Sequence, residues 1–219
     1  MNEYKILFLG STNTGAKTSL CKRIVYNTFN ERSIVTSGVE FLNKIIQTEF
    51  GEIKLKLWDS AGQDKFERIT RHYIKGSNWI ILGYDVTDRE SFESIKGLYG
   101  WYNIIKDNID INNVLIYLVG NKIDLVEKRV ISDEEGKSLA NDLNMKYFSV
   151  SAKTGEGVDI LLDDIVNSLL KKFPIKKSKK EDNKKMQIKM IKNKEIFNLN
   201  KMRLIIVKIK IFWHKYLVS

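Results

Sequence analysis

The fold is decided by the stretch Lys5-Ile-Leu-Phe-Leu-Gly-Ser-Thr-Asn-Thr-Gly-Ala-Lys-Thr-Ser-Leu-Cys21. Its apolar start, from Ile6 to Leu9, predicts a buried strand, and Lys17 opens a predicted helix that runs to about Tyr26. A glycine-containing loop joins the two. Because a helix N-terminus leaves backbone N–H groups unpaired and carries a partial positive charge, it attracts anions. This order of strand, loop and helix therefore predicts a site for phosphate groups, with Lys17 as a mobile cation and the Thr18 hydroxyl as a ligand for Mg²⁺.

The spacing of this loop departs from the usual phosphate-binding motif, G-x-x-x-x-G-K-[ST]. Counted from Gly10, the second glycine falls correctly at Gly15, but Ala16 separates it from Lys17. Counted back from Lys17, Ala16 and Ser11 occupy the two glycine positions. In either register the loop carries one extra residue. The predicted phosphate-binding residues are Gly10, Ser11, Thr12, Asn13, Thr14, Gly15, Ala16, Lys17, Thr18 and Ser19.

Length and charge indicate one domain followed by a basic extension. The chain has 219 residues and a net charge of +10, which residues 174–219 supply with 14 basic and 3 acidic residues. Residues 1–173 carry 23 basic and 24 acidic residues, so the domain itself has no basic excess and we expect no nucleic-acid partner. The single cysteine, Cys21, allows no disulfide within the chain, which suits a reducing compartment. We find no signal peptide and no run of about 18 uncharged apolar residues, so we expect a cytoplasmic protein.

The rest of the domain alternates between predicted strands and helices. Residues 39–50 and 52–58 alternate polar and apolar side chains and predict a hairpin. Strands are also expected at 79–86, 114–119 and 146–150, and helices at 91–108, 132–143 and 157–172. We therefore predict an α/β fold: a six-stranded, mostly parallel sheet with one antiparallel edge strand and about five helices. Ligands of such sheets bind at the carboxyl ends of the strands.

Three polar motifs follow predicted strands. Trp58-Asp-Ser-Ala-Gly-Gln-Asp64 places Asp59, a candidate Mg²⁺ residue, and Gly62 beside the phosphate loop. In Asn121-Lys-Ile-Asp124, the carboxylate of Asp124 can accept hydrogen bonds from the N1–H and the 2-amino group of guanine, whereas adenine lacks this pair of donors. Ser151-Ala-Lys153 can offer the Ala152 N–H to guanine O6. Each motif alone is more simply a polar loop that caps a strand, but together with the loop they indicate a guanine-nucleotide site.

Four further stretches carry a resemblance to a known family: Thr36-Ser-Gly-Val-Glu-Phe41, Asp64-Lys-Phe-Glu-Arg-Ile-Thr70, His72-Tyr-Ile-Lys-Gly76 and Leu82-Gly-Tyr-Asp-Val-Thr87. Over residues 4–173 the chain resembles a small GTPase of the Ras superfamily, and most closely a Rab. The resemblance implies the P-loop NTPase fold (a G domain) for residues 1–173. The spacing from Lys17 to Thr36 is that of the family, so the extra residue lies between Gly10 and Ala16.

The resemblance also implies roles for single residues. Lys17 would bridge the β- and γ-phosphates, Thr18 and Thr36 would ligate Mg²⁺, and Asp59 would support the ion through water. Gly62 would sense the γ-phosphate, and Gln63 would orient the attacking water, which makes Gln63 and Lys17 the catalytic residues. The base would be bound by Phe29, Asn121, Lys122, Asp124, Ser151, Ala152 and Lys153.

The implied function is a switch between GTP and GDP in vesicle trafficking. Hydrolysis in this class is slow until a partner supplies an arginine. We therefore expect an exchange factor, a GTPase-activating protein and effectors, all acting through the two switch regions. The apolar residues Val39, Phe41, Trp58 and Phe66 would face such partners. The alternative is that they form the core of the hairpin, and for Trp58 the two interpretations are about equal.

The overlong loop leaves an alternative open, a Rab-like interaction module with a degenerate loop that has lost effective nucleotide binding. If one backbone N–H misses its phosphate, the lost hydrogen bond costs roughly 1.5–3 kcal/mol, or about 10–100-fold in affinity. We predict that GTP and GDP still bind, more weakly than is usual. An ATPase or kinase is disfavoured because the motif at 121–124 selects guanine.

The extension begins at Pro174, which ends the last predicted helix. It is first Lys-rich, which favours disorder, and residues 202–218 are then apolar and basic. A Rab usually ends in prenylated cysteines, but this form has no cysteine after Cys21. Three interpretations remain: an anchor that contacts anionic membrane on the cytosolic face of endomembranes, an unstructured tail, or a wrongly assigned gene end.

Overall fold

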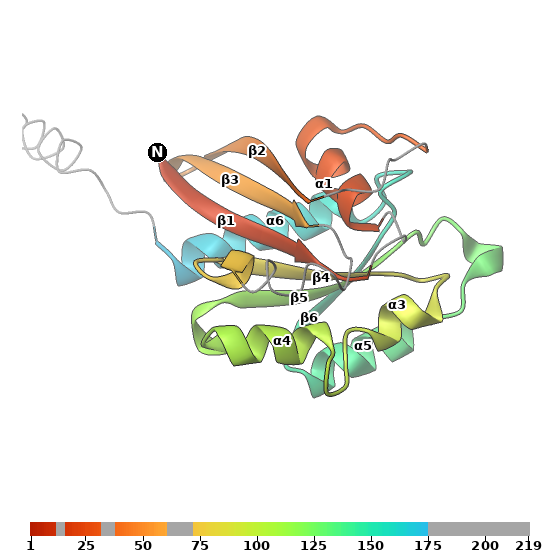
Figure 1. Ribbon diagram of the computed structural model, residues 1–219. Helices are drawn as coiled ribbons and strands as arrows, with labels where there is room; N and C mark the ends of the chain where they lie inside the picture. The colour runs from red at the N-terminus through yellow and green to blue at the C-terminus, as the bar shows by residue number, and fades with distance from the viewer. Residues whose placement is uncertain (12–15, 32–37, 61–71, 175–219) are drawn as a thin grey trace, which may run out of the picture. The chain divides into compact units, whose positions relative to one another are not determined.

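A computed structural model gives the fold and describes residues 1–11, 16–31, 38–60 and 72–174. The described strands form one six-stranded sheet in the order β2-β3-β1-β4-β5-β6 (Figure 1). Their bounds are β1 (Asn2–Leu9), β2 (Val39–Thr48), β3 (Gly51–Ser60), β4 (Trp79–Asp85), β5 (Leu115–Asn121) and β6 (Lys146–Val150). Edge strand β2 pairs antiparallel with β3, and the other four pairings are parallel. The predicted mostly parallel sheet with one antiparallel edge strand is confirmed.

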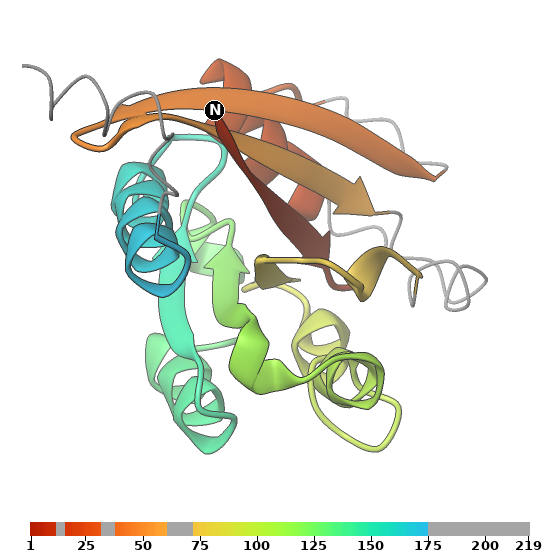
Figure 2. The ribbon, with the colours of Figure 1, turned by 90° about the vertical axis from the view of Figure 1, so that its left-hand side faces the viewer.

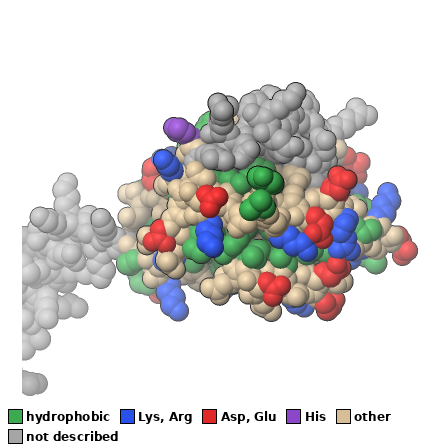
Figure 3. All heavy atoms as spheres, turned by 60° about the horizontal axis from the view of Figure 1, so that its bottom comes forward, with side chains coloured by type: hydrophobic (Ala, Val, Ile, Leu, Met, Phe, Trp, Pro, Cys, Tyr) green, Lys and Arg blue, Asp and Glu red, His purple; other side chains and the backbone are tan. Residues whose placement is uncertain are grey.

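Helices cover both faces of this sheet. The described α-helices are α1 (Ala16–Tyr26), α3 (Arg89–Glu93), α4 (Trp101–Asn108), α5 (Asp133–Asp142) and α6 (Val158–Lys172), with 3₁₀ turns η2 (Ile111–Asn113) and η3 (Val126–Lys128). Helices α1 and α6 pack on one face, and α3, α4 and α5 pack on the other (Figure 2). On the side of α3, α4 and α5, brought forward in Figure 3, acidic and basic side chains are interspersed.

The core has two layers because successive strand residues point to opposite faces. In β1, Ile6 and Phe8 join the core layer under α1 and α6, while Leu7 and Leu9 join the other layer. All four are at most 1% exposed. Each such side chain contributes about 1.5–3 kcal/mol through burial, so β1 is firmly held and the loop that follows it has a fixed start.

The single helix predicted for residues 91–108 is wrong in its middle. The structure has two shorter helices, α3 and α4, with residues 94–100 between them. Gly97 has a φ of +91°, which a helix does not allow, and a Cβ on Gly100 would lie 2.3 Å from the Lys96 carbonyl oxygen. The two glycines therefore interrupt the helix, although the apolar residues on either side follow a helical spacing.

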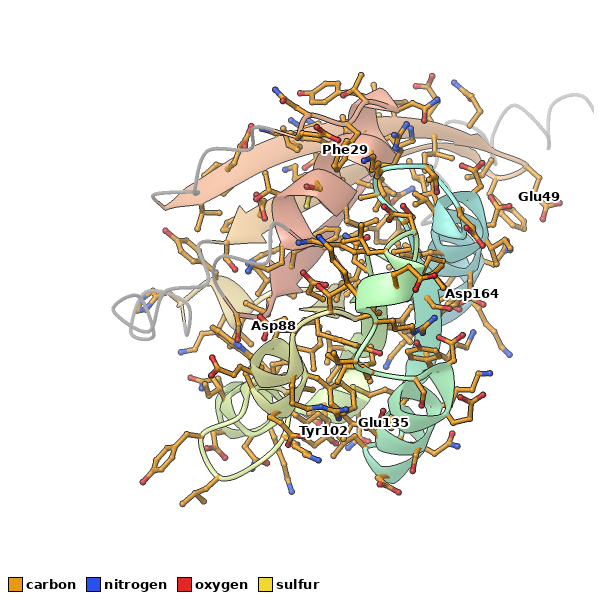
Figure 4. The ribbon with its side chains drawn as sticks, turned by 90° about the vertical axis from the view of Figure 1, so that its right-hand side faces the viewer. Phe29, Glu49, Asp88, Tyr102, Glu135 and Asp164 are labelled. Atoms are coloured by element: carbon orange, nitrogen blue, oxygen red, sulfur yellow. The ribbon has the colours of Figure 1, made fainter. Side chains whose placement is uncertain are left out.

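Helices α1, α5 and α6 lie where the sequence predicts them, and side-chain caps fix the starts of α3 and α5. Asp88 caps α3 by accepting hydrogen bonds from the N–H groups of Glu90 and Ser91. Ser132 and Glu135 form a reciprocal capping box at the start of α5. Figure 4 labels Asp88, which directly precedes α3, and Glu135 of α5; both helices pack on the same face of the sheet.

The fold brings the carboxyl ends of β1, β3, β4, β5 and β6 to one edge of the sheet, because these strands run parallel. The loops with the polar motifs begin at this edge. Among the described residues, no helix is both long enough and apolar enough to cross a membrane. The division into 1–173 and 174–219 stays a prediction, since 175–219 lie outside the described residues.

Candidate nucleotide-binding site

The loop after β1 begins with a glycine that no other residue can replace easily. Gly10 has a φ of +141°, and a Cβ added to it would lie 2.1 Å from the carbonyl oxygen of Gly83 in β4. The next residue, Ser11, donates its hydroxyl hydrogen to Ser94 Oγ at 2.7 Å, which ties the loop to the end of α3. The first half of the loop is thus fixed between two strands and a helix.

Lys17 lies in the first turn of α1 and is 7% exposed. Its Nζ donates to the carbonyl oxygens of Gly10 at 2.8 Å and Ser11 at 2.7 Å, so the side chain reaches back across the loop. Burial lowers the pKa of Lys17 to about 8, and the carboxylate of Asp59 partly opposes this effect. A buried cation that bonds to neutral carbonyls is well placed to receive an anionic ligand.

Thr18 and Asp59 meet beside this lysine. Asp59 lies near the end of β3, fully buried and paired in register with Phe8, and its Oδ2 accepts the Thr18 hydroxyl hydrogen at 2.5 Å. A hydroxyl oxygen and a carboxylate oxygen are ligands that Mg²⁺ prefers, so the two residues fit the predicted ion. The third predicted ligand, Thr36, lies outside the described residues.

Hydrogen bonds join the loops after β5 and β6. Asn121, 1% exposed, accepts at Oδ1 from the N–H of Lys122 at 2.7 Å and from the N–H of Ala152 at 2.9 Å. Ser151 donates its hydroxyl hydrogen to Asp124 Oδ1 at 2.6 Å. These bonds hold the Asp124 carboxylate next to Ala152. The Ala152 N–H that we predict to contact guanine O6 is donated to Asn121 here, so it would have to shift or be shared.

A cavity of about 210 Å³ opens beside these loops. Phe29, which Figure 4 labels on the segment after α1, lines this cavity together with Ala152 and Lys153. The full lining consists of Ser19, Phe29, Asn30, Glu31, Asn121, Lys122, Asp124, Leu125, Ala152 and Lys153. The structure therefore gathers Phe29, the residues of both motifs and the first turn of α1 around one space.

Two ion pairs join these residues, and sequence reasoning found neither acidic partner. Lys122 Nζ lies 2.6 Å from Asp85 Oδ2, and Lys153 Nζ lies 2.9 Å from Glu31 Oε1 at the mouth of the cavity. Asp85 ends strand β4 and is 4% exposed, so a search of every strand end for acidic residues would have found it. Glu31 gives no such signal, because its partner lies 122 residues away in the chain.

The remaining predicted site residues are described only in part or lie outside the described residues. Ala16 begins α1, although its side chain is not described. Thr12, Asn13, Thr14, Gly15, Thr36, Gly62 and Gln63 lie outside the described residues.

Comparisons with known proteins cover the same part of the chain. A sequence model of the Ras family matches residues 5–171. The chain is 41% identical over 166 residues to a Ras-related protein Rab-1 of Theileria parva, covering 76% of this chain and 74% of that protein. It is 40% identical over 168 residues to a Ras-related protein RabC of Dictyostelium discoideum, covering 74% of this chain and 83% of that protein. The family model runs from β1 to α6.

Proposed function

Since this chain belongs to the Ras family, as a Rab-like small GTPase that hydrolyses GTP and acts in vesicle trafficking, we propose that the strand-end residues described above form its guanine-nucleotide site. In this proposal the phosphates lie against Gly10, Ser11 and Lys17. The base occupies the cavity between Phe29 and the loops after β5 and β6. The residues outside the described ranges keep their predicted roles as part of the same proposal.

One observation carries this proposal: the cavity reaches from the base motif to the phosphate helix. Ser19, in the first turn of α1, lines the same cavity as Asp124 and Lys153. Because Ser19 follows Lys17 and Thr18 directly, a single ligand can extend from Asp124 to the lysine. A nucleotide has this shape, with an aromatic base at one end and anionic phosphates at the other.

The chemistry at each end supports guanine and Mg²⁺. Asp124 presents a carboxylate, an acceptor of the two donors that distinguish guanine from adenine. Thr18 and Asp59 would hold Mg²⁺, which neutralises charge on the phosphate oxygens when it is bound. Lys17 would place its cation between the β- and γ-phosphates, and Gln63 would orient the attacking water. Hydrolysis of this kind depends mainly on positioning and charge.

An aromatic cluster on the outer face of β2 and β3 supports the proposed binding of effectors. The rings of Phe41 and Trp58 are 4.6 Å apart at 87°, and those of Trp58 and Tyr73 are 5.4 Å apart at 62°. Phe41 is 57% exposed, whereas Trp58 is only partly so. Trp58 therefore both supports the hairpin and faces solvent. Tyr73 lies three residues after the stretch 64–70, which resembles the second switch region of a Rab, so this surface can respond to the bound nucleotide.

The proposed location is the cytosolic face of endomembranes, with residues 202–218 in contact with anionic lipid. Flotation of the full chain with anionic vesicles tests this contact. Loss of flotation after removal of residues 202–218 supports it, and unchanged flotation contradicts it.

The nucleotide released from protein purified with Mg²⁺ tests the proposed site. Chromatography of the denatured protein should detect GDP or GTP at close to one equivalent. A protein without nucleotide that also fails to bind GDP in calorimetry would instead support the degenerate interaction module. Neither the comparisons nor the described half of the loop favours that alternative.

The lowered pKa of Lys17 predicts that nucleotide binding takes up a proton. With a pKa of about 8 in the free protein, Lys17 is half protonated at pH 8, and bound phosphate favours its charged form. The bound state then holds more protons, so affinity is full below pH 8 and falls at higher pH, by about tenfold at pH 9. Calorimetry of GDP binding in buffers of different ionisation enthalpy should show uptake of about half a proton at pH 8. Uptake that does not increase between pH 7 and 8 would contradict this assignment.

The ion pair between Glu31 and Lys153 predicts a small, salt-dependent effect on nucleotide release. Both side chains are exposed, so Glu31→Gln should speed GDP release by only about 1.5–5-fold at low salt, and less at high salt. Glu93→Gln is the matched control, since it removes a similarly exposed pair with Lys96 at 3.1 Å on another face. Release rates that are equal in the two variants would show that the pair at the cavity does not retain nucleotide.

A further inference from the structure

The arginine in the last turn of α1, Arg23, contacts three residues in two chain segments beside the cavity. Its Nε donates to the carbonyl oxygen of Ala152 at 2.7 Å, and Nη2 donates to that of Lys153 at 2.6 Å. Its Nη1 donates to the backbone oxygen of Asn27 at 2.9 Å and to the side-chain oxygen of the same residue at 3.0 Å. Each nitrogen of the guanidinium group is therefore bonded to an oxygen.

These contacts reach two chain segments that line the cavity. Ala152 and Lys153 belong to one of them, and Asn27 starts the other, the short segment that carries Phe29 and Glu31. Arg23 and Lys153 are 130 residues apart in sequence, so local structure does not set their spacing. A planar guanidinium group with fixed donor directions can set that spacing, whereas a flexible ammonium group cannot.

Arg23 also links these two lining segments to the phosphate end of the site. It lies six residues after Lys17 on the same helix, which at 1.5 Å per residue is about 9 Å along the axis. Because α1 packs on the sheet through buried residues such as Leu20 and Ile24, it is a rigid spacer. One helix thus carries the lysine at one end and the arginine that holds the base loops at the other.

We propose that Arg23 is a positioning residue for guanine recognition. It holds the two lining segments at the separation at which Phe29 and Asp124 contact the base together, and it acts through these segments rather than on the nucleotide. This inference rests on the proposed function, because it requires guanine in the cavity. Loss of the hydrogen bonds from the Arg23 guanidinium group leaves the phosphate-binding residues in place, but lets the two segments that line the cavity move apart.

The test uses the full chain with Mg²⁺ and two nucleotides, GDP and IDP, whose hypoxanthine base lacks the 2-amino group. Arg23→Lys keeps the charge but not the fork, and should speed GDP release roughly tenfold. The ratio of GDP to IDP affinity should fall severalfold, because Asp124 no longer meets the 2-amino group in a fixed geometry. Arg23→Met should show the same changes more strongly.

Arg89→Lys is the matched control. Arg89 also bonds a backbone carbonyl, that of Val130 at 2.5 Å, and a side-chain oxygen, that of Glu135 at 2.6 Å, but it lies away from the cavity lining. Its variant should leave GDP release and the affinity ratio unchanged.

Two results would overturn the inference. If the Arg23 variants release GDP at the wild-type rate, or lose affinity for GDP and IDP by the same factor, Arg23 has at most a general structural role. If Arg23→Met does not fold, Arg23→Lys decides the matter alone. Failure of the wild-type chain to bind GDP is a separate result, which would remove the proposed site and this inference with it.

Discussion

Asp124→Asn should exchange the base preference of the protein from guanine to xanthine. The carboxylate of Asp124 accepts two hydrogen bonds from guanine, and hydrogen bonds to charged groups contribute roughly 1.5–3 kcal/mol each. An amide accepts only one of them and turns its NH₂ towards the other donor. GDP affinity should therefore fall by about 10²–10⁴-fold. Xanthine carries an oxygen at position 2, so the new NH₂ group has an acceptor there and affinity for XDP should rise.

Calorimetry with GDP and XDP on wild type and variant measures this exchange. Asp142→Asn, an exposed substitution on α5, serves as the control and should change neither affinity. The fold should survive in Asp124→Asn, because the amide oxygen can still accept the Ser151 hydroxyl hydrogen that Asp124 accepts now. Equal loss of both nucleotides would show that Asp124 supports the loop without reading the base.

The parts of this site that are predictable from sequence are those in which short motifs follow strands. Asp59 and Asn121 lie at the ends of parallel strands, and Lys17 lies in the helix that the loop after β1 leads into. Parallel strands bring their carboxyl ends to one edge whatever the sequence between them, so the motifs come together once the fold class is known. The inner hairpin strand could be predicted because its alternation of buried and exposed residues is local, and β4 because a continuous apolar run is typical of a strand buried on both faces.

The parts that could not be predicted depend on contacts between distant residues or on backbone geometry. Arg23 is an ordinary basic residue at the end of a helix until the loop 130 residues later folds against it. The hydrogen bond from Ala152 to Asn121 needs the relative position of two loops, which no motif specifies. Gly97 and Gly100 break a helix that apolar periodicity predicts as continuous, because periodicity does not register φ.

The alignment of the overlong loop with the phosphate-binding motif also depends on backbone geometry, which the sequence does not give. Sequence alone left two ways to align it, one starting at Gly10 and one at Ser11. The backbone favours Gly10 as the glycine that matters, since its φ of +141° and its contact with Gly83 exclude a side chain. Ser11 bonds to Ser94 through its side chain and so has a different role. These contacts favour the alignment that starts at Gly10.

Gly10→Ala should destabilise the protein strongly. A Cβ at this position lies 2.1 Å from a backbone oxygen of β4, which cannot rotate away as a side chain could. Strained backbone costs about 1–3 kcal/mol and overpacking another 1–3 kcal/mol, so the expected loss is about 2–6 kcal/mol. Against a typical total of about 5–15 kcal/mol this is a large fraction, and GDP affinity should fall with it because Lys17 bonds to the Gly10 oxygen.

Urea unfolding of wild type and variant, with and without GDP, measures this loss free of the contribution from bound ligand. Gly97→Ala is a close control, since Gly97 has a φ of +91° but no atom within 4 Å of the added Cβ. This variant should lose only the stability that backbone strain costs, about 1–3 kcal/mol. The difference in unfolding free energy between the two variants then isolates the contact with Gly83. If Gly10→Ala lost no more stability than Gly97→Ala, β1 and β4 would be able to separate at the loop. The first half of the phosphate site would then not be fixed in advance, and the lysine would have to order it when nucleotide binds.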